Sequence, residues 1–126
     1  MKYLVFTYGT LMKGQSAYGR FGDCEYVCDA TLFDYAIYEV GSYPAAVPLE
    51  GFKVEGEVYA VDEKLLERFD EYEEVGEIYD RKLVKVITAD KKTLEVFFYE
   101  YILDVRDLEL RKPEGKWSPI RNPMYV

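Results

Sequence analysis

Apolar residues recur along much of the chain with the two-residue period of β-strands. Residues 2–7 form a short apolar run that stops at a glycine-containing turn, and residues 25–40 contain recurring Tyr, Val, Thr, Leu, Phe and Ile. The segments 53–61, 78–88 and 93–102 show a similar pattern. Short runs rich in β-branched and aromatic residues are typical of strands. We therefore predict strands over these five ranges.

One segment has helical rather than strand periodicity. Asp62 is a suitable N-cap, and an apolar stripe follows it over the next turns. The stripe consists of Leu65, Leu66 and Phe69. We predict a helix that begins after Asp62 and ends near Tyr72, which places Glu73 just beyond its last turn.

The remaining segments are predicted to be connections. Residues 41–44, Gly-Ser-Tyr-Pro, should close the second strand as a turn, and residues 89–92 should join the last two strands as a hairpin. A polar stretch punctuated by glycines after residue 11 has room for one irregular turn of helix. The tail from residue 106 to 126 should consist of loops and at most one short helix.

Many strands and one helix favour a single α+β domain over residues 1–126. The strands lie on both sides of the helix in the sequence, which differs from the regular alternation of βαβ units. This order predicts a small mixed or antiparallel β-barrel with flanking helices. A chain of 126 residues is long enough to bury a substantial core as one domain.

Charge and composition exclude several classes of function. The chain has 24 Asp and Glu against 16 Lys and Arg, so we expect neither nucleic acid nor an anionic membrane as a partner. It has no histidine, which rules out Ser-His-Asp and Cys-His catalysis within the chain and removes the usual ligands of a catalytic zinc site. Two cysteines cannot supply a closed structural zinc site. An enzyme with this sequence must use carboxylates, tyrosines, lysines or the backbone.

Cysteine usage and the N-terminal run predict the compartment. Cys24 and Cys28 lie four residues apart on one predicted strand, about 13 Å from each other, which is too far for a disulfide and predicts two reduced thiols. The opening apolar run is too short for a secretory signal or a membrane span. We expect a cytoplasmic protein, and the sequence favours neither a monomer nor a homodimer.

Two short motifs are candidates for chemistry. Tyr8-Gly9-Thr10-Leu11 directly follows the first strand, and Gly9 allows a turn that points successive N–H groups at one anion, although an ordinary loop would look the same. Asp70-Glu71-Tyr72-Glu73-Glu74 follows the helix, where it is either a solvated charge run or the source of a general base whose pKa is raised by burial and like charge.

Together these motifs resemble the γ-glutamylcyclotransferase family, in particular its AIG2-like branch, which includes γ-glutamylamine cyclotransferases. The matching motifs occur in the family's order. They are Tyr-Gly-Thr-Leu at 8–11, Tyr-Pro at 43–44, Val-Glu-Gly-Glu-Val-Tyr at 54–59, Phe-Asp-Glu-Tyr-Glu at 69–73 and Tyr-Asp-Arg at 79–81. One departure is Glu74, which stands where members of the family often have glycine.

The resemblance implies a role for each matched residue. Glu73, which ends the Asp-x-Tyr-Glu motif, would be the catalytic acid/base. The substrate would be bound by Tyr8, Gly9, Thr10, Leu11 and Tyr79, with possible support from Tyr43 and Arg81. The resemblance also implies a small β-barrel with flanking helices and a small γ-glutamyl substrate, with no cofactor and no metal.

The implied reaction is intramolecular. The α-amine of a γ-glutamyl group attacks its own γ-carbonyl, which releases the attached amine and leaves 5-oxoproline. Whether the Gly9 loop binds the α-carboxylate or the oxyanion stays open at this point. So does the role of Glu71 and Glu74, which either raise the pKa of Glu73 or simply face water.

Three other interpretations are compatible with the sequence. The first is a non-catalytic binding module of the same fold that recognises an acidic metabolite or peptide. The second is a sugar hydrolase that pairs Glu73 with another carboxylate such as Glu57 or Glu77. The third is a structural or interaction protein, which would be favoured if Tyr8, Glu73 and Tyr79 failed to come together.

Overall fold

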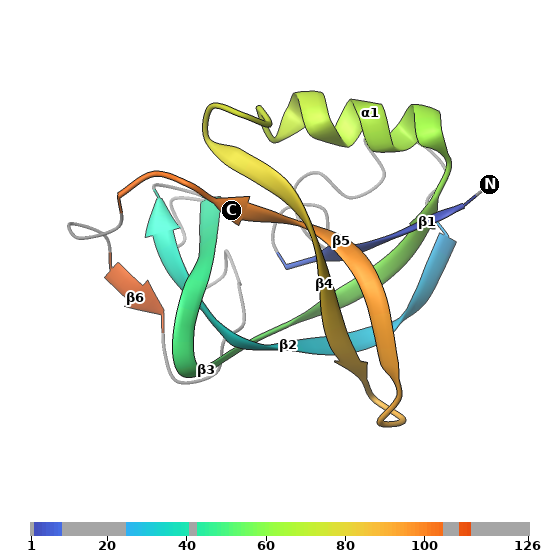
Figure 1. The fold of residues 1–126 in the computed structure, drawn as a ribbon, viewed down its shortest axis with the longest axis horizontal. Coiled ribbons are helices and arrows are strands. Elements are labelled where there is room, and N and C mark those ends of the chain that lie inside the picture. The colour runs from blue at the N-terminus through green and yellow to red at the C-terminus, as the bar shows by residue number, and fades with distance from the viewer. Residues whose placement is uncertain (1, 9–24, 41–42, 105–108, 112–126) are drawn as a thin grey trace, which may run out of the picture.

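The computed structural model describes residues 2–8, 25–40, 43–104 and 109–111. Within these ranges the chain forms six strands and one helix (Figure 1). In chain order they are β1 (Tyr3–Thr7), β2 (Glu25–Val40), β3 (Tyr43–Val61), α1 (Glu63–Tyr72), β4 (Tyr79–Thr88), β5 (Thr93–Tyr101) and β6 (Glu109–Arg111).

Five of the strands close into a ring. The order of hydrogen-bonded neighbours is β3-β1-β5-β4-β2, and β2 also pairs with β3, which joins the two ends of the sheet. β1 runs parallel to β5, whereas the other pairs in the ring are antiparallel. The predicted mixed β-barrel is therefore confirmed, and β6 adds to it as a short extra partner of β2.

α1 forms where the sequence predicted it. The carboxylate of Asp62 accepts a hydrogen bond of 2.8 Å from the N–H of Leu65, so it acts as the N-cap, an interaction that typically stabilises a helix by about 1 kcal/mol. The helix ends at Tyr72, with Glu73 as its C-cap. The buried residues of the helix are Leu65, Leu66 and Phe69.

Strands next to α1 bury both of their faces. Neighbouring residues of β1, Val5 and Phe6, belong to different core clusters, and so do Phe98 and Tyr99 of β5. The cluster that contains Phe6 and Phe98 fills the barrel, while the cluster that contains Val5 and Tyr99 packs against α1 on the outer face. Figure 1 shows α1 lying across this side of the barrel. The helix exit is thereby held close to β4 and β5.

The prediction for residues 41–52 was wrong in part. Tyr43 and Pro44 belong to β3, which begins ten residues earlier than the predicted strand at residue 53. The strand pattern of the sequence is interrupted here because the pairing of β2 with β3 contains a bulge. Phe33 pairs with Lys53, whereas Tyr35, two residues later, pairs with Pro48. At this bulge Gly51 has φ 87° and donates a hydrogen bond of 3.1 Å to the side chain of Asp34.

Other predictions had different outcomes. The hairpin at 89–92 is confirmed by two backbone hydrogen bonds, from the N–H of Thr88 to the carbonyl of Lys92 and from the N–H of Lys91 to the carbonyl of Thr88. The tail contains a short strand, β6, where only loops and a helix were expected, because residues 109–111 pair with the exposed edge of β2. Cys28 is a partly buried free thiol on β2. Cys24, the glycine-rich stretch and the rest of the tail lie outside the described residues.

The described part of the chain contains no helix that combines the length and the apolar character required to cross a membrane.

At Gly56 the end of β1 lies close against β3, which leaves no room for a side chain. A Cβ at this position would lie 2.8 Å from Cζ of Phe6 and would collide with the backbone carbonyl of Thr7. We expect Gly56→Ala to lower the free energy of unfolding by about 2 to 4 kcal/mol, because β1 and β3 must separate to admit a methyl group. Urea denaturation measures this change.

Gly51→Ala is the matched control for this prediction. Gly51 has a positive φ but nothing within 4 Å of an added Cβ, so the cost should be that of backbone strain alone, about 1 kcal/mol. A Gly56→Ala variant that loses no more stability than Gly51→Ala would contradict the close approach of β1 and β3.

Candidate active site

Glu73 is held in place by the turn that ends α1. Its N–H donates a 2.9 Å hydrogen bond to the carbonyl of Phe69, which completes the last helical turn. Glu74 follows with φ 50°, a conformation that favours glycine, and its carbonyl accepts a 3.2 Å hydrogen bond from the N–H of Ile78. Backbone hydrogen bonds therefore close the turn on both sides of Glu73 and limit where its side chain can point.

Glu73 is half-buried as a residue, and its carboxyl group, which lies among protein atoms, has no partner among the described residues. No hydrogen bond or ion pair joins it to another residue of the described ranges. Burial raises the pKa of Glu73 from 4.5 to about 8, since removal from water disfavours the charged form. Glu71 and Glu74 are exposed, so of the two options open for them the structure favours the solvent-facing one.

Tyr8 and Tyr79 lie close to Glu73. The Tyr8 hydroxyl, at the end of β1, donates a hydrogen bond of 2.5 Å to the carbonyl of Tyr99, and the Tyr79 hydroxyl donates one of 2.6 Å to the carbonyl of Pro44. Burial raises the pKa of Tyr8 well above its usual value, and the Tyr79 hydroxyl and the Glu73 carboxylate raise it further. Such an effect requires proximity, so residues from β1, β4 and the helix exit converge on one region.

The two tyrosine hydroxyls are already used as donors. Because each gives its hydrogen to a main-chain carbonyl, neither Tyr8 nor Tyr79 has a second hydroxyl hydrogen for a ligand. The Tyr8 oxygen also accepts a hydrogen bond from the backbone of Ala46. These side chains can therefore serve as buried walls next to Glu73.

A second carboxylate, Asp70, lies one helical turn before Glu73. Its Oδ2 accepts a hydrogen bond of 2.8 Å from Nη1 of Arg81, and its Oδ1 accepts one of 2.8 Å from the hydroxyl of Tyr99. The guanidinium of Arg81 also lies 5.0 Å from the centre of the Phe97 ring. The Asp70 carboxylate is thus fully engaged, in contrast to the carboxyl of Glu73.

Glu100 is a further buried carboxylate that the sequence did not single out. It is 7% exposed and follows Phe98 on the barrel-facing side of β5. Its two oxygens accept hydrogen bonds of 2.8 Å from Tyr35 and 3.0 Å from Lys82. The signal that could have revealed it is a glutamate in an inward position of a strand whose other inward residues are apolar.

The structure separates the remaining candidate residues. Arg81 lies on β4 and binds Asp70, whereas Tyr43 begins β3 with its backbone paired to Val40. Glu57 accepts a hydrogen bond from Tyr59, and Glu77 is exposed in the turn after α1. Gly9, Thr10 and Leu11 lie outside the described residues. Within the described ranges, no group of three His, Cys, Asp or Glu side chains is arranged to hold a metal ion.

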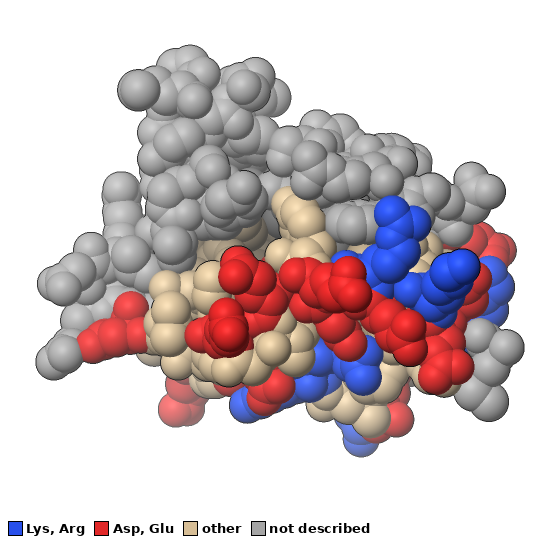
Figure 2. Space-filling model, turned by 90° about the horizontal axis from the view of Figure 1, so that it is seen from above, with Lys and Arg blue, Asp and Glu red and all other residues tan. Residues whose placement is uncertain are grey.

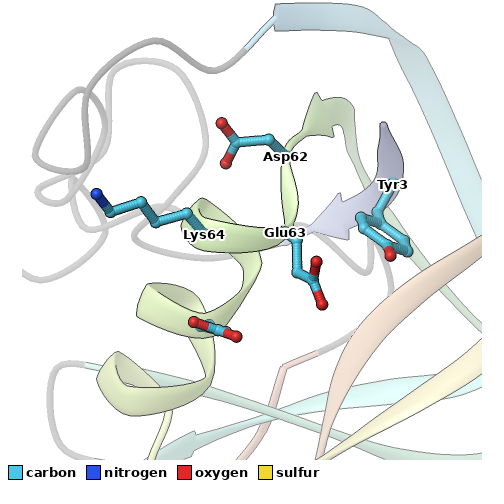
Figure 3. Close-up of a pocket in the computed structure, with 5 residues that line it drawn as sticks. Tyr3, Asp62, Glu63 and Lys64 are labelled. Carbon is cyan, nitrogen blue, oxygen red and sulfur yellow. The ribbon is translucent and has the colours of Figure 1, made fainter. Parts of the chain in front are cut away.

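Acidic side chains cover the outer surface on the α1 side. Figure 2 shows them gathered on the face seen from above, with a smaller group of basic side chains beside them. A separate pocket lies at the start of α1 (Figure 3). It is lined by Tyr3, Asp62, Glu63, Lys64 and Glu67, and the length of the helix, roughly 15 Å, separates it from Glu73.

Comparison with known proteins places the chain in a family. Residues 5–119 match the family model described as gamma-glutamyl cyclotransferase, AIG2-like. The chain belongs to this family. It is 39% identical over 93 residues to gamma-glutamylaminecyclotransferase B of Danio rerio, a match that covers 66% of this chain and 49% of that protein. The chain therefore spans about half the length of this relative.

Two other comparisons cover more of the related proteins. A putative gamma-glutamylcyclotransferase of Vibrio cholerae is 39% identical over 87 residues, which are 68% of this chain and 74% of that protein. The crystal structure of the uncharacterized protein PH0828 of Pyrococcus horikoshii superimposes with a TM-score of 0.73 at 28% identity, covering 98% of this chain and 96% of that one. The two chains therefore share the same fold.

The raised pKa of Glu73 predicts a pH-dependent effect on stability. Because the pKa is about 8 in the folded protein and 4.5 without burial, the folded state holds the proton more tightly, and stability is lost as pH rises from about 4.5 to 8. Glu73→Gln is neutral at every pH and avoids this loss. We expect its stability gain over the parent to be on the order of 3 kcal/mol larger at pH 8 than at pH 5.

Urea denaturation of both proteins at the two pH values measures this difference. Glu71→Gln is the control, since Glu71 is an exposed carboxylate two residues away on α1. Its difference from the parent should not change with pH. A Glu73→Gln gain that is equal at pH 5 and pH 8 would show that the Glu73 carboxyl is not desolvated.

Proposed function

We propose that the protein converts a γ-glutamyl amine or γ-glutamyl amino acid into 5-oxoproline and a free amine, with Glu73 as the only acid/base. The observation that carries the proposal is the buried carboxyl of Glu73, which has a pKa of about 8 and no partner among the described residues. Membership of the gamma-glutamyl cyclotransferase family supports the choice of reaction. Relatives named gamma-glutamylaminecyclotransferase support an amine as the leaving group.

The reaction needs a base whose proton affinity matches that of an amine. The substrate's α-ammonium must lose a proton before its nitrogen can attack the γ-carbonyl carbon. The α-amino group at the end of a peptide has a pKa of about 7.7 to 8.0, and the free α-carboxylate of a γ-glutamyl substrate raises the pKa of its α-ammonium. A base whose pKa is about 8 is therefore well suited to take this proton. A solvated glutamate, with a pKa near 4.5, would be a much weaker base.

One carboxyl group is sufficient for both proton transfers. Glu73 takes a proton from the α-ammonium, the α-nitrogen forms a bond to the γ-carbon, and the γ-carbonyl oxygen becomes negatively charged in the tetrahedral intermediate. The γ-carbonyl then re-forms, and the bond from the γ-carbon to the leaving nitrogen breaks as Glu73 returns the proton to that nitrogen. The ring nitrogen gives its second proton to the released amine, which departs as an ammonium ion. No electrons are transferred to another molecule, so the reaction needs no redox cofactor.

The surroundings of Glu73 suit a substrate that must fold on itself. Attack closes a five-membered ring, and holding the chain in the bent conformation supplies much of the rate, with effective molarities of roughly 10⁵ to 10⁸ M for such reactions. The buried rings of Tyr8 and Tyr79 would form walls against the bent chain. In this proposal the amides of Gly9, Thr10 and Leu11, which directly follow Tyr8, bind the α-carboxylate or the oxyanion.

The test is the activity of Glu73→Gln, which preserves volume and removes the base. With a panel of γ-glutamyl amines and γ-glutamyl amino acids, we expect the parent to release 5-oxoproline and the variant to lose about 10²- to 10⁴-fold in kcat/KM. Glu71→Gln, an exposed neighbour on α1, should stay within about twofold of the parent. Release of 5-oxoproline and of the amine is measured together.

Two outcomes would count against the proposal. Parental activity in Glu73→Gln would remove Glu73 from the mechanism. Saturable binding of γ-glutamyl compounds by the parent, with no 5-oxoproline formed from any of them, would favour the non-catalytic binding module of the same fold.

A further inference from the structure

Three elements meet at the exit of α1 through the side chain of Asp70. Arg81 reaches Asp70 from β4, and Tyr99 reaches it from β5, each over 2.8 Å. The backbone carbonyl of Tyr99 in turn accepts the hydrogen bond from Tyr8 at the end of β1. A chain of three hydrogen bonds therefore runs from Arg81 through Asp70 and Tyr99 to Tyr8.

This network lies next to Glu73. Asp70 is three residues before Glu73, so the two side chains leave the same side of the helix. Both the Glu73 carboxylate and the Arg81 guanidinium affect the pKa of the Tyr99 hydroxyl, the first raising it and the second lowering it. Tyr99 thus lies close enough to both Glu73 and Arg81 to interact electrostatically with each of them. Glu73 must stay unpaired to act as a base, and Arg81 is a cation that could pair with it.

We propose that Asp70 is a positioning residue that binds the cationic Arg81 and so keeps it off Glu73, while its bond to Tyr99 holds the helix exit against β5. This inference rests on the proposed function, because an unpaired Glu73 matters only if Glu73 is a base. The alternative is that Asp70 only stabilises the fold. The two roles differ in what happens to Glu73 when Asp70 loses its charge.

The tyrosines around Glu73 carry no positive charge that could pair with its carboxylate. Tyr8 from β1 and Tyr79 from β4 are neutral, and both donate to main-chain carbonyls. Tyr99 from β5 is also neutral, with a pKa raised by burial and by Asp70. Arg81 is the cation of this group, and 30% exposure of its side chain leaves it room to turn. Without the charge of Asp70, Arg81 loses its acidic partner on a side of the helix that Glu73, three residues after Asp70, also occupies.

The experiment measures the titration of the Glu73 carboxyl by NMR with ¹³C-labelled glutamate in the parent and in variants. We expect Asp70→Asn to lower the Glu73 midpoint by about one to two pH units, because an opposite charge that comes within a few ångströms favours the carboxylate. The double variant Asp70→Asn/Arg81→Gln removes the freed cation. Its midpoint should return to within about half a unit of the parent value.

Tyr35→Phe is the matched control. It removes a tyrosine-to-carboxylate hydrogen bond of 2.8 Å, the same length as that of Tyr99 to Asp70, but on the barrel-facing side at Glu100. The variant should lower the melting temperature and leave the Glu73 midpoint unchanged. In activity assays, Asp70→Asn should lose at least about tenfold in the plateau value of kcat/KM and move the rise of its pH profile to lower pH. The double variant should regain the parental profile.

Two results would overturn the inference. One is a folded Asp70→Asn variant whose Glu73 midpoint equals that of the parent. The other is a double variant whose Glu73 midpoint is lowered by a unit or more. This second result tests the inference even if Asp70→Asn does not fold, because the double variant has neither the Asp70 nor the Arg81 charge. The titration needs no substrate, so a parent protein without turnover would contradict the proposed function and leave this inference to be decided by the midpoints.

Discussion

The removal of one carboxyl group from water is the interaction on which the rest of the site depends. Burial of Glu73 without a partner disfavours its charged form, which raises its pKa to about 8. At neutral pH this arrangement costs the folded state free energy that a partnered carboxylate would not cost. The fold therefore has to hold Glu73 by other means, and it does so through the buried stripe of α1 and the hydrogen-bonded turn after it.

Three other carboxylates of the barrel and helix have hydrogen-bond partners, unlike Glu73. Asp70, Glu57 and Glu100 each accept a hydrogen bond from a tyrosine hydroxyl. The chain has 13 tyrosines and no histidine, so neutral hydroxyls act as its main side-chain donors to buried acids. A tyrosine hydroxyl gives a carboxylate a hydrogen-bond donor without adding a positive charge of its own. The unpartnered Glu73 differs in this respect from Asp70, Glu57 and Glu100.

Local signals in the sequence predicted the parts of the fold that local interactions determine. The N-cap at Asp62, the apolar stripe and the end of α1 near Tyr72 were all predicted, because they depend on residues a few positions apart. The first half of β3 was missed because its pairing with β2 passes through a bulge at Asp34 and Gly51, which looks like a strand end in the sequence. β6 was missed because three residues form a strand only where an edge is available.

Individual residues of the site could be predicted from the sequence, but their arrangement in space could not. Glu73 and Tyr8 could be selected from motifs, but their proximity depends on the parallel pairing of β1 with β5, which no local pattern reveals. The roles of Asp70 and Tyr99 were missed because the Tyr99 to Asp70 bond joins residues 29 positions apart, through the register of β4 and β5. Glu100 looked like one more charge among the 24 acidic residues until its inward position was known.

The pH dependence of kcat/KM for the parent protein tests the central claim most directly, because it reports the pKa of the free enzyme's base. If Glu73 is a desolvated base, kcat/KM for a γ-glutamyl substrate rises about tenfold per pH unit below pH 7 and levels off near pH 8, the pKa of Glu73. A rate that already reaches its plateau by pH 5 to 6 would mean that the base is an ordinary solvated carboxylate, and would contradict the account.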